Sequence, residues 1–299
     1  MSAVNVGLVG AGPWASGFHA PMLAGGPETR LAGVWARRPE AARALAGRFA
    51  TRAFEDYGAL LDACEAVSFA VPPEVQAPMA IQAARAGRAL LLEKPLAADL
   101  AGAMALVDAI DTAGVPTQLM LTRRFRPGVR DFVERARAFD VRGAYVRHIT
   151  DELFSPSYLN AWRERQGILL DFGFHALDLA DAAAGGVKEI GAVGDPHGFM
   201  ALTCLHEGGV VSQISISGRV VVPAGHLKTI DLYGPAGTLA LDCRDLGDDS
   251  AATRFNVRSE FASAIRSGRS HPVDAHHGLY LQRLLTEAAA QLGQTLDGM

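Results

Sequence analysis

The sequence predicts an α/β domain built on a parallel sheet, followed by an α+β domain that contains antiparallel strands. Three observations support this prediction. Short apolar runs alternate with helix-like segments in the first part of the chain, which is typical of βαβ units. Glycine-rich turns then join neighbouring apolar runs, which is typical of hairpins. The pattern changes near residue 121 without a low-complexity linker, so we expect residues 1–121 and 122–299 to form two domains.

Each expected element of the first domain has a local reason. Apolar runs of strand length lie at residues 4–9, 31–35, 66–71, 89–92 and 115–121. Helix-like segments separate them, at residues 15–24, 39–49, 74–85 and 99–113. Pro39 suits a first helical turn, Asp99 suits an N-cap, and Gly114 suits a helix end. Because strands and helices alternate, right-handed crossovers predict a parallel sheet.

The second domain shows a different order of elements. A helix-like stretch at residues 127–137 precedes strand-like runs at 141–150, 187–193, 199–206, 210–217, 229–233 and 238–242. Glycine-rich turns at residues 207–209 and 234–237 join neighbouring runs, which predicts hairpins and therefore antiparallel pairing. Two helices are expected to close the chain, and the last one repeats leucine and alanine at helical spacing.

Composition excludes several classes of protein. The chain has 299 residues, of which 49% are hydrophobic and 20% charged, as in an ordinary globular protein. A net charge of −4 argues against a general nucleic-acid binder. An apolar stretch of about 18 residues is absent, so no membrane span is expected. Three scattered cysteines, Cys64, Cys204 and Cys243, predict no disulfide framework, and we expect a reducing, cytoplasmic location.

A glycine motif, Gly10-x-Gly12-x-x-Ala15, lies between the first strand and the first helix. Glycines at such a turn let backbone amides approach a pyrophosphate at the helix N-terminus, as in the Rossmann dinucleotide-binding fold. We therefore expect Gly10, Gly12, Pro13 and Trp14 to bind a dinucleotide cofactor. The alternative is a turn with a purely structural role.

The end of the second strand affects the choice of cofactor. A Rossmann domain that binds NAD carries an acidic residue there, which contacts the ribose hydroxyls. Ala36 stands at that position and is followed by Arg37 and Arg38. Because a guanidinium can hold a phosphate with two hydrogen bonds, this pattern favours NADP over NAD. The alternative is that both arginines are solvated residues before a helix.

Lysine is rare in this chain, which makes each one informative. Only Lys94, Lys188 and Lys228 occur among 28 basic residues, and the richness in arginine and alanine is typical of GC-rich bacterial genomes. Lys94 lies in Glu93-Lys94-Pro95, directly after the fourth strand, where an open α/β sheet binds its ligands. We expect Glu93 to orient the Lys94 ammonium toward a reacting group. The alternative is an ordinary surface lysine.

A second group of reactive side chains follows later in the chain. Asp171, His175 and Asp178 lie within eight residues, and the apolar spacing after His175 predicts a helix. Histidine is a natural proton acceptor near neutral pH, so His175 is the candidate acid–base residue, with Asp171 beside it. The alternative is that Asp171 caps the helix and His175 is a core residue.

Together these residues resemble the Gfo/Idh/MocA oxidoreductase family, which includes glucose–fructose oxidoreductase and inositol dehydrogenase. The likeness spans residues 4–127 and 155–185, and it is weaker from residue 255 onward. The strings that carry it are Gly10-x-Gly12, Val71-Pro72-Pro73, Ala86-Gly87-Arg88-Ala89-Leu90-Leu91-Leu92-Glu93-Lys94-Pro95-Leu96, Arg124-Phe125-x-Pro127 and Gly167-Ile168-Leu169-Leu170-Asp171-x-Gly173-x-His175-x-x-Asp178. Their occurrence in this order is specific, although each string alone is not.

The resemblance implies a Rossmann domain joined to an α+β domain with a large, mostly antiparallel sheet. It implies hydride transfer between NADP or NAD and a carbinol or ketone carbon of a sugar-like, polyol or cyclic substrate. Lys94, Asp171 and His175 would surround the reacting oxygen, with His175 exchanging its proton and Lys94 polarising it. The resemblance also implies a homodimer or homotetramer formed through the exposed face of the second-domain sheet.

The expected ligands extend beyond these three residues. Further cofactor ligands are Val71, Pro72, Glu93 and Lys94. The expected substrate ligands are Lys94, Met120, Arg124, Trp162, Arg163, Asp171 and His175. Gln76 departs from the family pattern, in which many members carry histidine after the Pro-Pro turn, and it can hydrogen-bond but cannot become charged. Met120 also departs from it, and can either narrow the substrate pocket or fill the core. His19 is expected to pack in the core.

The sequence thus predicts an enzyme, an NAD(P)-dependent dehydrogenase or ketoreductase that favours NADP. One alternative is a catalytically silent cofactor or sugar sensor of the same fold. The other is an enzyme that acts on a sugar nucleotide or a natural-product intermediate. We expect no metal, because His271, His276 and His277 lack carboxylate or cysteine neighbours at ligand spacing. We also expect no nucleic-acid or membrane partner.

Overall fold

The computed structural model describes residues 2–155, 164, 167–223 and 225–293 and divides into two compact units. Within these ranges, the first unit runs to Thr122 and includes Ser250–Leu279, and the second contains Arg123–Asp249 and the residues from Tyr280 onward. The first unit thus ends one residue after the expected boundary. It also contains Ser250–Leu279, which the sequence pattern placed in the second domain.

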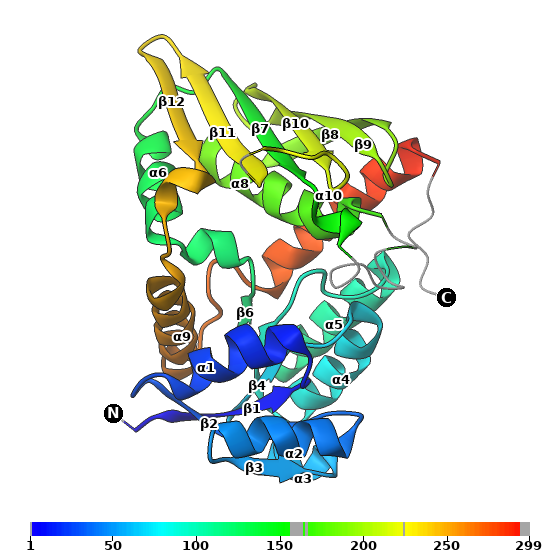
Figure 1. The fold of residues 1–299 in the computed structure, drawn as a ribbon, viewed down its shortest axis with the longest axis vertical. Coiled ribbons are helices and arrows are strands. Elements are labelled where there is room, and N and C mark those ends of the chain that lie inside the picture. Colours follow the sequence, from blue (N-terminus) through cyan, green and yellow to red (C-terminus); the bar gives the residue numbers. More distant parts are fainter. Residues whose placement is uncertain (1, 156–163, 165–166, 224, 294–299) are drawn as a thin grey trace. The chain divides into compact units, whose positions relative to one another are not determined.

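The first unit is built on a six-stranded sheet, sheet A, whose strands are all parallel and whose order is β3-β2-β1-β4-β5-β6 (Figure 1). The strands are β1 (Val4–Val9), β2 (Thr29–Trp35), β3 (Arg52–Phe54), β4 (Ala66–Phe69), β5 (Ala89–Leu92) and β6 (Thr117–Leu119). All residues of β4 and β5 are buried, as in a parallel sheet covered on both faces. The predicted parallel sheet is confirmed, and β3 is the strand of this sheet that the sequence analysis did not predict.

Helices connect the strands of sheet A. They are η1 (Ala15–His19), α1 (Ala20–Ala24), α2 (Pro39–Arg48), α3 (Tyr57–Asp62), α4 (Pro73–Arg85) and α5 (Leu100–Ala113). The carboxylate of Asp99 accepts the Gly102 N–H at 2.6 Å, so Asp99 caps α5 as predicted. Gly114, with φ of +64°, ends the same helix. No helix in the described ranges is long and apolar enough to cross a membrane.

Helix α9 (Ser250–Ser267) belongs to the first unit because its buried residues form hydrogen bonds with residues of that unit. Arg258, 7% exposed, donates to the Glu28 carboxylate at 2.7 Å and to the Met22 carbonyl at 3.2 Å. The Gln118 side chain donates to the Val257 carbonyl at 3.0 Å. The next helix, α10 (Ala275–Gln291), begins in the first unit and ends in the second.

The second unit contains a six-stranded sheet, sheet B, with the order β12-β11-β7-β10-β9-β8. The strands are β7 (Gly143–Thr150), β8 (Val187–Gly194), β9 (Phe199–His206), β10 (Val211–Ser217), β11 (His226–Gly234) and β12 (Gly237–Asp242). Only β7 and β10 pair in parallel, and the other neighbours are antiparallel. Both predicted hairpins are present, β9–β10 and β11–β12. The expected large, mostly antiparallel sheet is confirmed.

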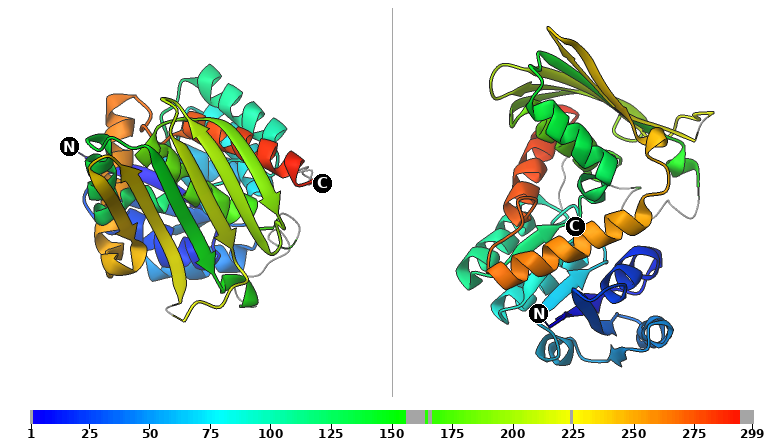
Figure 2. Two further views of the ribbon diagram at one scale, coloured as in Figure 1. Left: turned by 90° about the horizontal axis from the view of Figure 1, so that it is seen from above. Right: turned by 90° about the vertical axis from the view of Figure 1, so that its left-hand side faces the viewer.

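The two faces of sheet B differ. Helix α8 (Phe174–Ala184) packs against β7, β10 and β11, where Val146, Ile214 and Ile230 are buried. Because side chains alternate along a strand, Phe199 and Val211 lie on the opposite face and are exposed. The described helices of the second unit leave this outer face open (Figure 2). A short helix, α6 (Pro127–Arg137), also packs against α8.

Candidate active site

The first expected cofactor segment is the turn that follows β1. Gly10 has φ of +118°, a conformation that favours glycine, and its N–H donates to the Trp35 carbonyl at 2.8 Å. A Cβ on Gly10 would lie 2.3 Å from the Ala70 carbonyl oxygen and 3.2 Å from Val71 Cγ1. Only glycine therefore fits this turn. Val71 lies beside it, and the exposed Pro72 follows at the start of α4.

Gly12 leaves open space at the start of the next helix, beside Pro13 and Trp14. All three residues are exposed, and no described atom outside the local chain lies within 4 Å of a Cβ built on Gly12. The Gly12 carbonyl accepts the Ser16 N–H at 2.9 Å, so helical bonding begins directly here. The N–H groups of a first helical turn have no partner within the helix and attract anions. These residues therefore fit the pyrophosphate of a dinucleotide cofactor.

The end of β2 carries the residues expected to select the cofactor. Ala36 is half-buried, and Arg37 and Arg38 are exposed. Within the described part of the chain, neither guanidinium takes part in a hydrogen bond or an ion pair. The acid that would bind ribose hydroxyls is absent at Ala36. Both arginines are therefore available to a negatively charged ligand.

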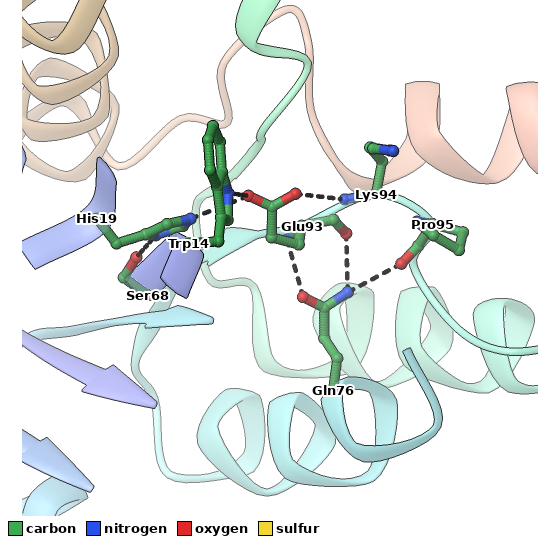
Figure 3. Close-up of polar contacts among 7 residues, drawn as sticks. All are labelled: Trp14, His19, Ser68, Gln76, Glu93, Lys94 and Pro95. Carbon is green, nitrogen blue, oxygen red and sulfur yellow. Dashed lines mark hydrogen bonds and ion pairs between the residues drawn. The ribbon is translucent and has the colours of Figure 1, made fainter. Parts of the chain in front are cut away.

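Glu93, Lys94 and Pro95 form a turn directly after β5, and the Lys94–Pro95 peptide bond is cis. The buried side chain of Gln76, on α4, holds this turn (Figure 3). Its Oε1 accepts the Glu93 N–H at 2.8 Å. Its Nε2 donates to the carbonyls of Glu93 at 2.8 Å, Pro95 at 3.1 Å and Leu96 at 3.1 Å. Gln76 thus fixes the backbone that carries Lys94.

The Glu93 carboxylate makes a second set of contacts (Figure 3). Its Oε1 accepts the Trp14 indole N–H at 2.5 Å and lies 2.9 Å from His19 Nε2. Its Oε2 accepts the Lys94 N–H at 3.3 Å. His19 Nδ1 lies 2.8 Å from Ser68 Oγ, and both residues are fully buried. His19 packs in the core as predicted, but it also links β4 to the turn, which sequence reasoning missed.

Lys94 and Met120 occupy different environments. Lys94 is half-buried, and its side chain points away from Gln76 (Figure 3). Its turn follows the carboxyl end of β5, the end of a parallel strand at which such sheets bind ligands. Met120 is 1% exposed, and its N–H donates to the Leu92 carbonyl at 2.7 Å. This burial favours the core-filling role of Met120 over its predicted role in a substrate pocket.

Asp171 and His175 lie where two helical segments meet in the second unit. Asp171 belongs to a π-helical turn, η4 (Leu169–Gly173), and His175 is the second residue of α8. Asp171 is 3% exposed and His175 is half-buried. The helix predicted after His175 is therefore present, and Asp171 precedes it as expected. Single π turns are frequent at functional sites.

Arg124, an expected substrate ligand, binds Asp178. Its Nη1 donates to Asp178 Oδ1 at 2.7 Å, and the two side chains are 20% and 2% exposed. Asp178 lies three residues after His175 and therefore shares its helix face. The ion pair anchors α8 on the side that carries His175. The other two expected ligands of this region, Trp162 and Arg163, lie outside the described residues.

His148 and Arg123 lie beside this segment and were missed by sequence reasoning. The His148 ring, 2% exposed, stacks on Phe172 with ring centres 4.5 Å apart, and its Nδ1 is 3.3 Å from the Phe172 carbonyl oxygen. Burial, and then the charge of Arg123, lower the pKa of His148 well below its usual range, so the imidazole is neutral at neutral pH. These contacts join distant segments, so no local motif marks them.

The strand order of sheet A and the open turn at Gly12 define a dinucleotide-binding domain of the Rossmann class. The Lys94 turn adds a basic group beside the strand ends. The sequence of residues 4–120 matches a protein family described as an oxidoreductase family with an NAD-binding Rossmann fold. The chain is thus similar to this family, Gfo/Idh/MocA, over its first unit, which supports the resemblance that its motifs predicted.

Relatives with named activities extend the likeness into the second unit. The dTDP-3,4-didehydro-2,6-dideoxy-alpha-D-glucose 3-reductase of Streptomyces violaceoruber is 29% identical over 253 residues, which cover 80% of this chain and 73% of that protein. The inositol 2-dehydrogenase of Rhizobium meliloti (strain 1021) is 26% identical over 254 residues, which cover 80% of this chain and 76% of that protein.

Solved structures share the fold over nearly the whole chain. GenD2 from gentamicin A biosynthesis, solved in complex with NAD, has a TM-score of 0.85 at 20% identity and covers 98% of this chain and 95% of its own. Levoglucosan dehydrogenase, solved with NADH and L-sorbose, has a TM-score of 0.84 at 19% identity and covers 97% of this chain and 98% of its own. At such identities the likeness establishes the fold.

Proposed function

We propose that the protein is an NAD(P)-dependent dehydrogenase or ketoreductase acting on a carbinol or ketone carbon of a small sugar-like, polyol or cyclic substrate. The observation that carries the proposal is the pair of turns after β1 and β5, which place the open Gly12 backbone and Lys94 at the same edge of sheet A. The named activities of the relatives, a deoxysugar 3-reductase and an inositol 2-dehydrogenase, support this substrate class.

The roles of the side chains follow from their surroundings. A bound nicotinamide dinucleotide would supply the hydride acceptor or donor, held at its pyrophosphate by the Gly10 and Gly12 turn. Lys94, whose backbone is fixed by neighbouring side chains, polarises the substrate oxygen. His175 takes the hydroxyl proton during oxidation and returns it during reduction. Asp171 holds a neighbouring hydroxyl or the imidazole.

Cofactor titration and initial rates test this function. We expect NADPH or NADH to bind, and Lys94→Ala and His175→Ala to keep that binding while lowering turnover about 10²-fold or more. Lys188→Ala, which removes an exposed lysine on β8, is the control and should keep full turnover. Unchanged turnover in both site variants would remove the catalytic assignment. Binding without turnover on any alcohol or carbonyl would instead indicate a sensor.

We further propose that NADP is preferred to NAD. The support is that Arg37 and Arg38 are exposed and, among the described residues, unpaired, with no acid at Ala36. A lost charge-assisted hydrogen bond is worth about 1.5–3 kcal/mol, so Arg37→Ala should weaken NADPH binding about 10-fold or more and leave NADH binding unchanged. Arg85→Ala, at an exposed arginine of α4, is the matched control. Equal losses for both cofactors would contradict the preference.

We also propose that the outer face of sheet B forms a homodimer or homotetramer contact. Four large apolar side chains on this sheet are exposed: Val193 at 69%, Phe199 at 48%, Val211 at 46% and Tyr233 at 45%. Apolar residues that gather on one open sheet face are typical of an interaction surface. Light scattering should find an oligomer, and the double variant Phe199→Asp/Val211→Asp should be monomeric. A monomeric wild type would contradict this proposal.

A further inference from the structure

Lys228 is a lysine to which the proposed function gives no role. It is one of only three lysines among 28 basic residues. Lys94 carries the proposed chemistry and Lys188 is exposed, whereas the Lys228 side chain is only 18% exposed. Burying an ammonium is unfavourable unless an anion compensates its charge. A partly buried lysine therefore needs an anion beside its ammonium, and Glu152, whose Oε1 lies 2.8 Å from Lys228 Nζ, is one such anion.

The strand register brings Lys228 together with other basic side chains. In the antiparallel pair β7–β11, Lys228 lies opposite His148, and His226 lies opposite Thr150. Alternation along the strands puts these side chains on the face of sheet B that α8 covers. Arg123 Nη2 lies 3.0 Å from His148 Nε2. We call Arg123, His148, His226 and Lys228 the basic cluster.

The basic cluster borders the segment that carries the proposed acid–base chemistry. His148 stacks on Phe172, which directly follows Asp171 in the chain. The charge of His175 also acts on His148 and contributes to its lowered pKa. A ligand group held by the cluster would therefore lie beside a substrate that His175 deprotonates.

The charge balance of the cluster favours an anion. Glu152 pairs with Lys228 at 2.8 Å, but its side chain is 34% exposed. Asp242, a second acid near the cluster, is held by Arg244. Burial, and then the charge of Arg123, lower the pKa of Lys228 although Glu152 acts to raise it. The protein therefore holds the Arg123 guanidinium and the Lys228 ammonium close together at an energetic cost that a bound anion would relieve.

We propose that the basic cluster binds an anionic group of the substrate, a carboxylate or a phosphate, and that the substrate is an acidic sugar derivative. The inference rests on the proposed function and names its substrate class. The ammonium of Lys228 and the guanidinium of Arg123 supply charged donors, which form the stronger kind of hydrogen bond to an anion. The neutral ring of His148 adds polar contact without a competing charge. Glu152 compensates the ammonium charge before the anion binds and competes with the anion for Lys228.

Matched sugars test the inference by binding, without reliance on turnover. Calorimetry compares D-glucose, D-galactose and D-mannose with the corresponding uronates and 6-phosphates on the wild-type protein. We expect at least one acidic form to bind about 10-fold or more tightly than its neutral parent, a difference of about 1.4 kcal/mol. The uronate and phosphate arms distinguish the two anions. If no acidic form binds more tightly than its parent, the inference is overturned.

Variants of the ion pair identify the residues involved. Lys228→Met should weaken the preferred acidic sugar about 10-fold and leave its neutral parent unchanged, whereas the control Lys188→Met should change neither. Glu152→Gln, at a more exposed position, removes a competing charge and should tighten the acidic sugar a few-fold, which keeps the test usable if Lys228→Met fails to fold. Equal losses for acidic and neutral sugars, or no effect of Glu152→Gln, would assign the pair a structural role and overturn the inference.

The inference and the proposed function can fail separately. If acidic sugars bind as expected but no hydride transfer is found with either cofactor, the dehydrogenase assignment fails and the anion site stands. If hydride transfer occurs only on neutral sugars and acidic forms bind no better, the anion site fails and the dehydrogenase assignment stands.

Discussion

Replacement of Gln76 by leucine tests how the turn that carries Lys94 is held. Leucine has a similar size but no polar atoms, so the Glu93 N–H and the carbonyls of Glu93, Pro95 and Leu96 lose contacts of 2.8 to 3.1 Å in a buried region. A buried polar group left unsatisfied costs about 1–3 kcal/mol. With one N–H and at least one carbonyl affected, we expect the free energy of unfolding to fall by about 2–6 kcal/mol.

Chemical denaturation followed by circular dichroism measures this change. Gln82→Leu, at an exposed position of the same helix α4, is the matched control and should change the free energy of unfolding by less than about 0.5 kcal/mol. Because a misplaced catalytic group can reduce rate about 10²-fold, Gln76→Leu should also lower turnover while cofactor affinity stays nearly constant. A Gln76→Leu protein that unfolds at the wild-type denaturant concentration would refute the reasoning.

Two further predictions concern Arg258 and His148. Arg258→Met leaves the Glu28 carboxylate and the Met22 carbonyl without their partner, so denaturant titration should show a loss of about 2–3 kcal/mol in the free energy of unfolding. His148 stays neutral in the folded protein, because its pKa is well below 6.5, but takes up a proton in the unfolded chain as pH falls. The free energy of unfolding therefore falls on acidification. This one histidine contributes about 1.4 kcal/mol of the fall between about pH 7.5 and 5.5. The His148→Gln variant should lack that contribution.

Each of these predictions has a clear contrary outcome. Arg254→Met, at a less buried arginine of the same helix α9, is the control for Arg258→Met. If Arg258→Met loses no more unfolding free energy than Arg254→Met, the ion pair with Glu28 does not hold the helix. For the imidazole, the stability difference between wild type and His148→Gln should shrink as pH falls. A difference that stays constant with pH would show that His148 is not held neutral.

The sequence by itself determined the class of the first domain and the glycine turn after its first strand. Strands and helices were predicted from the spacing of apolar residues, and this spacing depends only on residues that are close in the sequence. Asp99 and Gly114 mark helix ends for equally local reasons, a side-chain cap and a left-handed backbone. Gly10 belongs to the same class, because its backbone angle is one that other residues avoid. Such local features can be recognised in a single sequence, without knowing which residues pack against them.

Only the tertiary structure decided which distant residues complete each region. Gln76 holds the Lys94 turn, His19 reaches Glu93, and His148 stacks on Phe172, although each pair is well separated along the chain. The return of α9 to the first unit likewise depends on the meeting of Arg258 and Glu28. Such contacts satisfy buried polar groups wherever the fold brings a partner, so no spacing rule encodes them. The order of the strands in sheet A, and of those in sheet B, determines which of these partners meet.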